Sequence, residues 1–294
     1  MWPKSLKAVV LFLLAYNSVL SQQNIAYHLS ANKTYKVEQN VNQEIVQQLD
    51  GTEHIIQNSI KSTYQFKTKS ITDSSFILQC RYTLFKLKST SNLYGEIMNI
   101  NTDSIPDEEN MESKLFSGLT QAVLNIELLK TGKVKKVDGT ENLINQMIAN
   151  ADIEEEFTKA VIKEAMTKEF GDTKLANSFE QMMYIYPVKK VHIGDTWTNS
   201  YTGELSAVNT WTLNTLSPNI TISGSSNITF TSVDQSTEMI LKGTQNTTIT
   251  CNKKTGFIET MLVRSKVSGN TILKESNALK IPTYIITTTS YKTL

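Results

Sequence analysis

Tyr186-Pro-Val-Lys-Lys-Val-His-Ile-Gly-Asp-Thr-Trp197 is the stretch that divides the chain into two kinds of sequence. A helical pattern precedes it, and sequence typical of β-strands follows it to the end. Within the stretch the proline disfavours a helix, Val191 and Ile193 alternate with polar residues, and Gly194-Asp195 favours a turn. We therefore expect the chain to leave a helix here and enter a sheet, with Trp197 as a large apolar anchor.

Three long runs nearer the N-terminus alternate apolar and polar residues. This alternation is typical of antiparallel strands with one face on a core and the other in water. The apolar positions are Tyr35, Val37, Val41 and Ile45, then Ile56, Ile60, Tyr64 and Phe66, and finally Phe76, Leu78, Cys80, Tyr82 and Leu84. Asp50-Gly51 and residues 72–75 predict the turns of a meander, and a shorter strand is expected at about 93–101.

The middle of the chain predicts a hairpin and then a helical block. Residues 124–139 form the hairpin, with its turn at Thr131-Gly132. Apolar residues at helical spacing then continue through about 140–185. In the second helix of this block we expect a capping box at Asp152 and Glu155, and an apolar face that includes Phe157 and Val161.

Five further strands are predicted after Trp197. Their approximate ranges are 207–216, 219–231, 236–251, 256–268 and 281–292. The predicted fold class is therefore α+β and mainly antiparallel β, with a curved sheet or incomplete barrel covered by the helical block.

The N-terminus has the features of a cleaved signal peptide. Lys4 and Lys7 precede an apolar run at 8–15, and small or short residues follow at 19–21. The run is about half of the roughly 20 residues needed to span a bilayer. We expect cleavage after Ser21, a loose segment at 22–33, and one exported β-rich domain over 22–294. It would be periplasmic or secreted, without a transmembrane segment and without a lipid anchor, because no cysteine follows the cleavage point.

The chemistry-bearing residues predict no reaction. The 29 Lys and Arg residues nearly balance 28 Asp and Glu, so no positive field favours nucleic acid. Three histidines lie in unrelated segments, and the acidic stretch 103–112 lacks the spacing of an EF-hand loop. No nucleophile, phosphate-binding or dinucleotide motif occurs. We therefore expect no catalytic residue, no metal and no cofactor, and we expect that the protein is not an enzyme. A hydrolase whose carboxylates meet only in the fold stays an alternative.

Cys80 and Cys251 are the only cysteines, and each lies in a predicted strand. Export would permit a disulfide between them. Two buried thiols acting as small apolar side chains are the alternative, and the sequence leaves both open.

Three segments resemble a family of exported proteins of unknown function from Gram-negative bacteria. They are Pro187–Trp197, the Cys-Asn-Lys-Lys-Thr-Gly-Phe-Ile segment at 251–258, and the hairpin from Leu129 to Gly139. The resemblance implies no activity and supplies no catalytic residue. The layout is also similar to the periplasmic lipoprotein-carrier fold, a half-barrel that holds an acyl chain in its concave face.

The leading functional hypothesis is non-enzymatic binding of a lipid or another apolar ligand. The candidate lining residues are Tyr64, Phe66, Phe76, Leu78, Tyr82 and Leu84, because they form one-faced apolar rows on long strands. The same rows would also suit simple packing on the helices. A structural or protein-interaction module of the cell envelope or surface is the alternative function, and the sequence indicates no particular protein partner.

Overall fold

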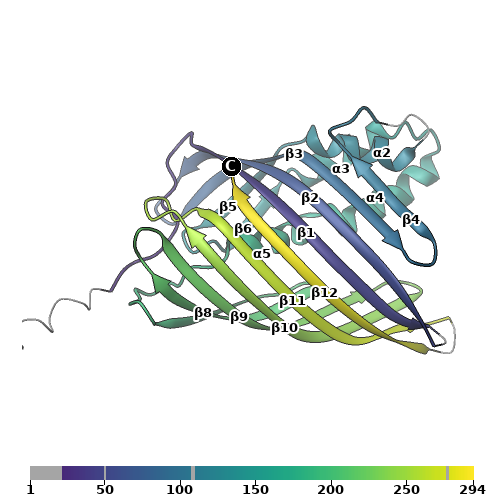
Figure 1. Cartoon of the computed structure of the whole chain (residues 1–294). Coiled ribbons are helices and arrows are strands. Elements are labelled where there is room, and N and C mark those ends of the chain that lie inside the picture. The colour runs from purple at the N-terminus through teal and green to yellow at the C-terminus, as the bar shows by residue number, and fades with distance from the viewer. Residues whose placement is uncertain (1–21, 50, 107–109, 276–277) are drawn as a thin grey trace, which may run out of the picture.

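The computed structural model describes residues 22–49, 51–106, 110–275 and 278–294. In these residues twelve antiparallel strands form one open, curved sheet (Figure 1). The strand order is β6-β5-β3-β2-β1-β12-β11-β10-β9-β8-β7, and β4 pairs with β3. The predicted fold class is confirmed. The signal peptide predicted at 1–21 and residues 107–109 of the acidic stretch lie outside the described residues.

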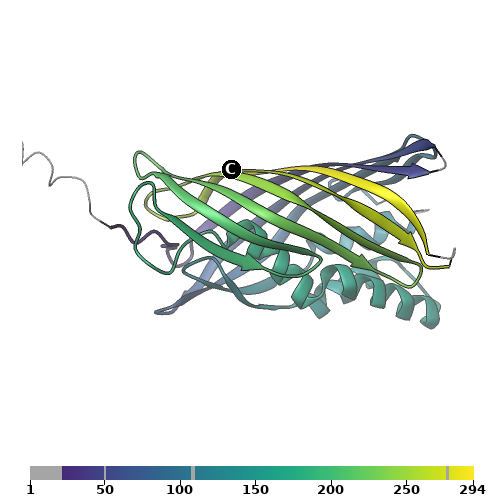
Figure 2. The same cartoon turned by 90° about the horizontal axis from the view of Figure 1, so that it is seen from below.

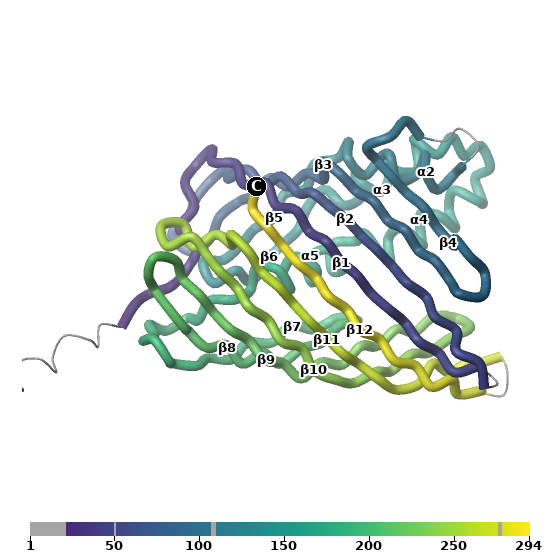
Figure 3. The backbone as a smooth tube through the Cα atoms, in the orientation of Figure 1, coloured from purple at the N-terminus to yellow at the C-terminus, as the bar shows by residue number. Residues whose placement is uncertain are grey.

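The long strands follow the alternation of the sequence. The strands are β1 (Thr34–Leu49), β2 (Thr52–Ile71), β3 (Ser75–Ser91), β4 (Gly95–Asn101), β5 (Leu124–Leu129), β6 (Val134–Asp138), β7 (Thr196–Tyr201), β8 (Leu205–Thr215), β9 (Ile220–Val233), β10 (Thr237–Cys251), β11 (Ile258–Leu273) and β12 (Leu279–Thr293). β1 pairs with β12, so the first and last strands lie side by side (Figure 3).

The helices lie along one side of the sheet (Figure 2). They are α2 (Met111–Ser117), the 3-10 turn η1 (Gly118–Thr120), α3 (Thr140–Asn150), α4 (Glu156–Phe170) and α5 (Asp172–Met183). α5 is amphipathic and buries Leu175, Phe179, Met182 and Met183. None of the described helices is both long and apolar enough to cross a membrane.

The prediction for α4 was wrong in two respects. Glu155 is the N-cap and no side chain caps the helix, so Asp152 and Glu155 form no capping box. Phe157 and Val161 are 74% and 52% exposed, and α4 buries no residue. Its partly buried apolar residues are Ile162 and Met166, which were not predicted, and Phe170, which belonged to the predicted apolar face. Periodicity predicted the helix, but only the position of its neighbours decides which stripe packs.

The segment from α5 to β7 connects the two edges of the open sheet. The backbone N–H of Val134 in β6 donates to Glu180 Oε1 in α5 at 3.1 Å. Beyond the helix, Trp197 Nε1 in β7 donates to the carbonyl oxygen of Ile185 at 3.0 Å. The stretch around 186–197 therefore returns the chain to the sheet, as predicted. The two hydrogen bonds connect one edge of the sheet to α5 and the other edge to the segment directly after α5.

The N-terminal segment is not loose, contrary to the prediction for residues 22–33. Ile25, Tyr27 and Leu29 are buried, and Tyr27 is completely inaccessible. The Tyr27 hydroxyl donates to the carbonyl oxygen of Met183 at 3.1 Å, and its ring meets Tyr186 edge-on. Apolar residues at every second position were the signal for this packing.

Cys80 and Cys251 are free and buried, so the possible disulfide is not formed. Cys80 lies in β3 and Cys251 in β10, and the strands β2, β1, β12 and β11 separate them in the sheet. The alternative of two thiols packed as small apolar groups is the one that the structure shows.

Candidate functional site

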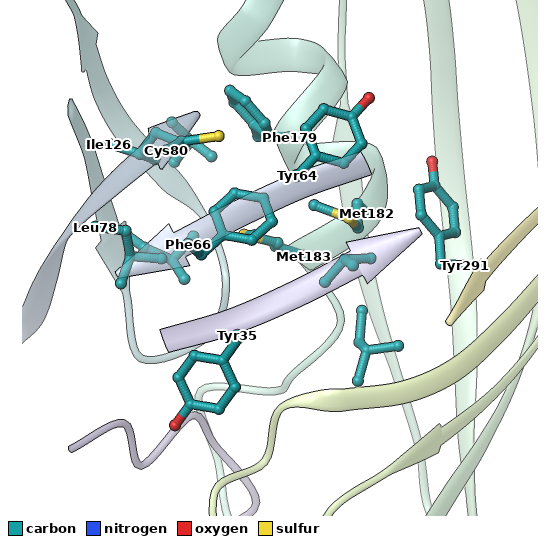
Figure 4. Packing of buried hydrophobic residues seen from close by; sticks show 14 of the residues in the cluster. Tyr35, Tyr64, Phe66, Leu78, Cys80, Ile126, Phe179, Met182, Met183 and Tyr291 are labelled. Atoms are coloured by element: carbon teal, nitrogen blue, oxygen red, sulfur yellow. The ribbon is translucent and has the colours of Figure 1, made fainter. Parts of the chain in front are cut away.

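The six residues predicted to line a ligand site lie on β2 and β3. Five of them are buried in one cluster that includes α2, α3 and α5, which we call the helix-covered cluster. The rings of Tyr64 and Phe66 lie 6.2 and 6.0 Å from that of Phe179 in α5 (Figure 4). Phe76, Leu78 and Tyr82 belong to the same cluster, and Leu84 is half-buried outside it. The structure thus packs the predicted row against a helix.

A second apolar cluster lies on the same face of the sheet, toward the β1–β2 turn. We call it the distal cluster. Its buried members are Tyr201, Ala207, Ile228, Leu241, Val267 and Ile285, with Ile45, Leu205, Phe230 and Met239 partly buried beside them. All of these described residues come from strands β1 and β7 to β12, and none from a helix. The described helices contribute no apolar residue to the distal cluster, whose six buried members are at most 6% exposed because they pack against one another in the curve of the sheet.

A row of polar residues separates the two clusters. We call this row the polar belt. It crosses nine strands in direct register: Ser89, Asn58, Gln43, Thr287, Ser265, Gln245, Ser226, Asn209 and Asn199. On β10, for example, Gln245 lies between Ile249 of the helix-covered cluster and Leu241 of the distal cluster. We call the face of the sheet that carries both clusters the inner face. Along each strand from β8 to β12, this face changes from apolar to polar and back to apolar.

A cavity of about 180 Å³ lies where the middle of the belt meets the distal cluster. Its polar lining includes Gln43, Gln181, Gln245, Ser265 and Thr287, and its apolar lining includes Ile228, Phe230, Val267 and Ile285. None of the described residues around it is acidic, basic or histidine. Thr289, Tyr201 and Tyr291 complete the polar lining. Burial raises the pKa of both tyrosine hydroxyls, so both remain neutral donors.

A larger open groove of about 610 Å³ lies among α3, α4, α5 and the β7–β8 turn. Its charged groups bind one another: Lys174 pairs with Glu204 at 2.5 Å and Glu169 at 3.5 Å. The Thr140 hydroxyl is likewise bonded to Asp172. With these groups already paired, the groove is a weaker candidate than the cavity at the polar belt.

The polar belt was missed from the sequence. Gln43 falls in the apolar phase of β1, between Val41 and Ile45, and Asn209 interrupts β8 in the same way. Each of these polar residues is an even number of positions from its apolar neighbours, so its side chain faces the same side of the sheet. This spacing was the signal in the sequence that could have identified them. Their alignment into one row depends on strand register, which a single sequence does not specify for partners as distant as Gln43 and Thr287.

The chain belongs to a family of unknown function. The model described as "Family of unknown function (DUF6263)" matches residues 73–258. This confirms the predicted resemblance at the level of a family without a known activity, while export and a Gram-negative source stay predictions. No curated protein matches the chain.

A solved structure shows a related fold. A lipovitellin structure, described as "Lipid-protein interactions in lipovitellin", aligns with a TM-score of 0.54 at 9% identity over 91% of this chain. The match spans 25% of the lipovitellin chain, so this chain corresponds to about a quarter of that protein. The COG4313 outer membrane channel from Pseudomonas putida F1 aligns over 94% of this chain and 100% of its own, with a TM-score of 0.26 and 9% identity. The second likeness is too distant to carry an argument.

Proposed function

We propose that this protein binds a lipid or another apolar ligand on the inner face of its curved sheet, without catalysing a reaction. The carrying observation is the cavity of about 180 Å³ between the polar belt and the distal cluster, which is lined by apolar side chains and neutral polar ones. Sites for small apolar ligands are typically concave, with apolar walls and a few placed polar groups. The fold shared with lipovitellin, whose structure concerns lipid–protein interactions, supports the same function.

The proposed setting is outside the cytoplasm, in the periplasm or secreted, after removal of residues 1–21. The basic and apolar pattern of those residues supports export. An exported carrier would keep an apolar ligand away from water between two membranes or surfaces.

Native mass spectrometry tests the binding directly. After incubation with a lipid extract, we expect protein ions that carry noncovalent adducts, and chloroform extraction should release a lipid. A homogeneous unliganded mass, together with no uptake of fluorescent lipid, would contradict the proposal.

Two matched variants test whether the ligand binds on the inner face. Ile285 belongs to the distal cluster and Ile286 is its neighbour on the outer face of β12. Ile285→Thr should weaken binding several-fold, because it places a hydroxyl in the apolar surface, whereas Ile286→Thr should not. Equal effects of the two changes would show that binding does not use this surface.

A structural or interaction module is the second candidate function. The observation that favours it is the cavity size, since about 180 Å³ is below the roughly 300–1,000 Å³ of typical ligand pockets. It predicts that the protein co-purifies with a protein partner and that lipid extracts leave its mass unchanged.

A further inference from the structure

The polar belt is hydrogen-bonded at both of its arms. On the β1 side, Asn58 Nδ2 donates to Gln43 Oε1 at 2.9 Å, and Gln43 Nε2 donates to the Thr287 hydroxyl at 3.4 Å. On the β7 side, the Ser226 hydroxyl donates to Asn209 Oδ1 and Asn209 Nδ2 to Asn199 Oδ1. These bonds link the side chains within each arm to one another.

The centre of the belt is not satisfied in the same way. In the described part of the chain, the side chains of Ser265 and Gln181 make no hydrogen bond, and Gln245 bonds only through its amide nitrogen, to the Tyr201 hydroxyl at 3.3 Å. All four residues line the cavity. Beside them, the Thr247 hydroxyl is buried and has no partner among the described residues. Ser265 and Gln181 are partly exposed, so water can bond to them, whereas Gln245 is 6% exposed and its amide oxygen has no partner among the described residues. Because buried polar groups are normally hydrogen-bonded, the Gln245 amide at the cavity wall and the neighbouring Thr247 hydroxyl favour a polar ligand group there.

The electrostatics of the cavity restrict the charge of that group. No acidic, basic or histidine side chain is among the described residues that line it. A charged ligand group would therefore lose water without gaining a counter-ion, which costs far more than burying a neutral hydroxyl or carbonyl group. Amides and hydroxyls, in contrast, supply both donors and acceptors to a neutral group.

We propose that the centre of the polar belt holds the uncharged polar head of an amphipathic ligand, whose apolar part lies on the distal cluster. The ligand class is a neutral lipid with hydroxyl or ester groups, such as a glyceride or a sterol. A free fatty acid or an anionic phospholipid does not fit the same place in its ionised form. This inference rests on the proposed binding of an apolar ligand and specifies which kind it is.

Two ligands with the same acyl chain but different head groups measure the contribution of the head group to the affinity. Monooleoylglycerol is neutral, whereas oleate is an anion at about pH 8. Displacement of the uncharged probe N-phenylnaphthylamine from the full-length mature protein measures both affinities. Monooleoylglycerol should bind at least about tenfold more tightly than oleate, since ten-fold is only ~1.4 kcal/mol of head-group discrimination.

A pair of variants on one strand provides the matched control. Gln245 lies in the cavity and is 6% exposed, and its neighbour Asn246 is exposed on the outer face of β10. Gln245→Glu places a carboxylate in the cavity and should weaken monooleoylglycerol binding at about pH 8 by at least about tenfold. Asn246→Asp adds the same charge on the other face and should leave the affinity unchanged.

The outcomes distinguish this inference from the proposed function. Equal or tighter binding of oleate to the unaltered protein would overturn the neutral-head inference and leave apolar-ligand binding intact. Unchanged affinity in a folded Gln245→Glu variant would also overturn it. Absence of binding by the probe and both ligands would overturn both proposals. Because the comparison of the two ligands needs no variant, it decides the matter even if Gln245→Glu does not fold.

Discussion

Trp197 lies half-buried on β7, and its indole N–H holds the segment that follows α5. A completely buried Trp→Ala change costs about 3–5 kcal/mol. Because part of this ring is accessible, Trp197→Ala should cost about 2 kcal/mol of unfolding free energy, measured by urea denaturation. Trp197→Phe should lose about 1 kcal/mol, the hydrogen bond to Ile185, and so separate the bond from the packing. A Trp197→Ala variant as stable as the parent would show that the residue does not anchor the chain.

Asp195 makes the turn before β7 sensitive to acid. The backbone N–H of His192 donates to Asp195 Oδ2 at 2.9 Å, and the His192 ring lies 3.1 Å from the same oxygen. These contacts hold the pKa of Asp195 below its ordinary value of 3.8. A lowered carboxyl pKa stabilises the fold above the ordinary pKa, and this contribution disappears as the pH falls through the folded pKa. The stability difference between the parent and Asp195→Asn should therefore be full at about pH 6 and shrink below about pH 4. A difference that does not change with pH would contradict this.

The two thiols give a prediction about accessibility. Both cysteines are inaccessible, and burial raises the pKa of Cys80 above its ordinary range and that of Cys251 to about 12. Since the thiolate is the reactive form, neither cysteine should react with a maleimide in the folded protein at neutral pH. Both should react in denaturant without prior reduction. A thiol that appears only after reduction would reveal a disulfide.

At the scale of the elements, α5 and α4 should differ sharply in stability. Phe179 of α5 is 3% exposed between Tyr64 and Phe66, whereas Phe157 of α4 is 74% exposed. Phe179→Ala should cost about 3–5 kcal/mol and Phe157→Ala less than about 0.5 kcal/mol. The same substitution in two neighbouring helices makes each the control for the other. Hydrogen exchange should likewise be faster in α4 than in α5, and similar protection would contradict the packing described for α4.

The elements also show how far sequence reasoning reaches. The alternation in β1 to β3 and the turn at Gly194-Asp195 predicted strands correctly, because period and turn chemistry are local properties. The partly buried stripe of α4 and the row of Gln43, Thr287 and Gln245 could not be predicted in the same way. Both depend on which distant residues become neighbours, which is settled by the packing of the complete sheet.

At the scale of the whole molecule, the curvature of the sheet depends on close contact between strand backbones. Gly243 lies on the inner face of β10, between Val267 and Ile228. A Cβ atom there would lie 1.8 Å from the carbonyl oxygen of Lys266. Gly243→Ala should therefore force β10 and β11 apart and cost at least about 1–3 kcal/mol. Lys242→Ala, at the exposed neighbouring position, should change stability by less than about 0.5 kcal/mol, and equal effects would show that the contact is not needed.

The pairing of β1 with β12 joins residues as far apart in sequence as Val37 and Thr293. During synthesis from the N-terminus, β1 can pair with β2 early, but its other edge lacks its partner until β12 leaves the ribosome. Contacts of such long sequence separation slow folding, and an unpaired strand edge can join a neighbouring chain. The nascent protein therefore has an unpaired edge on β1 until β12 has been made, and a chaperone that shields this edge would prevent pairing with a neighbouring chain.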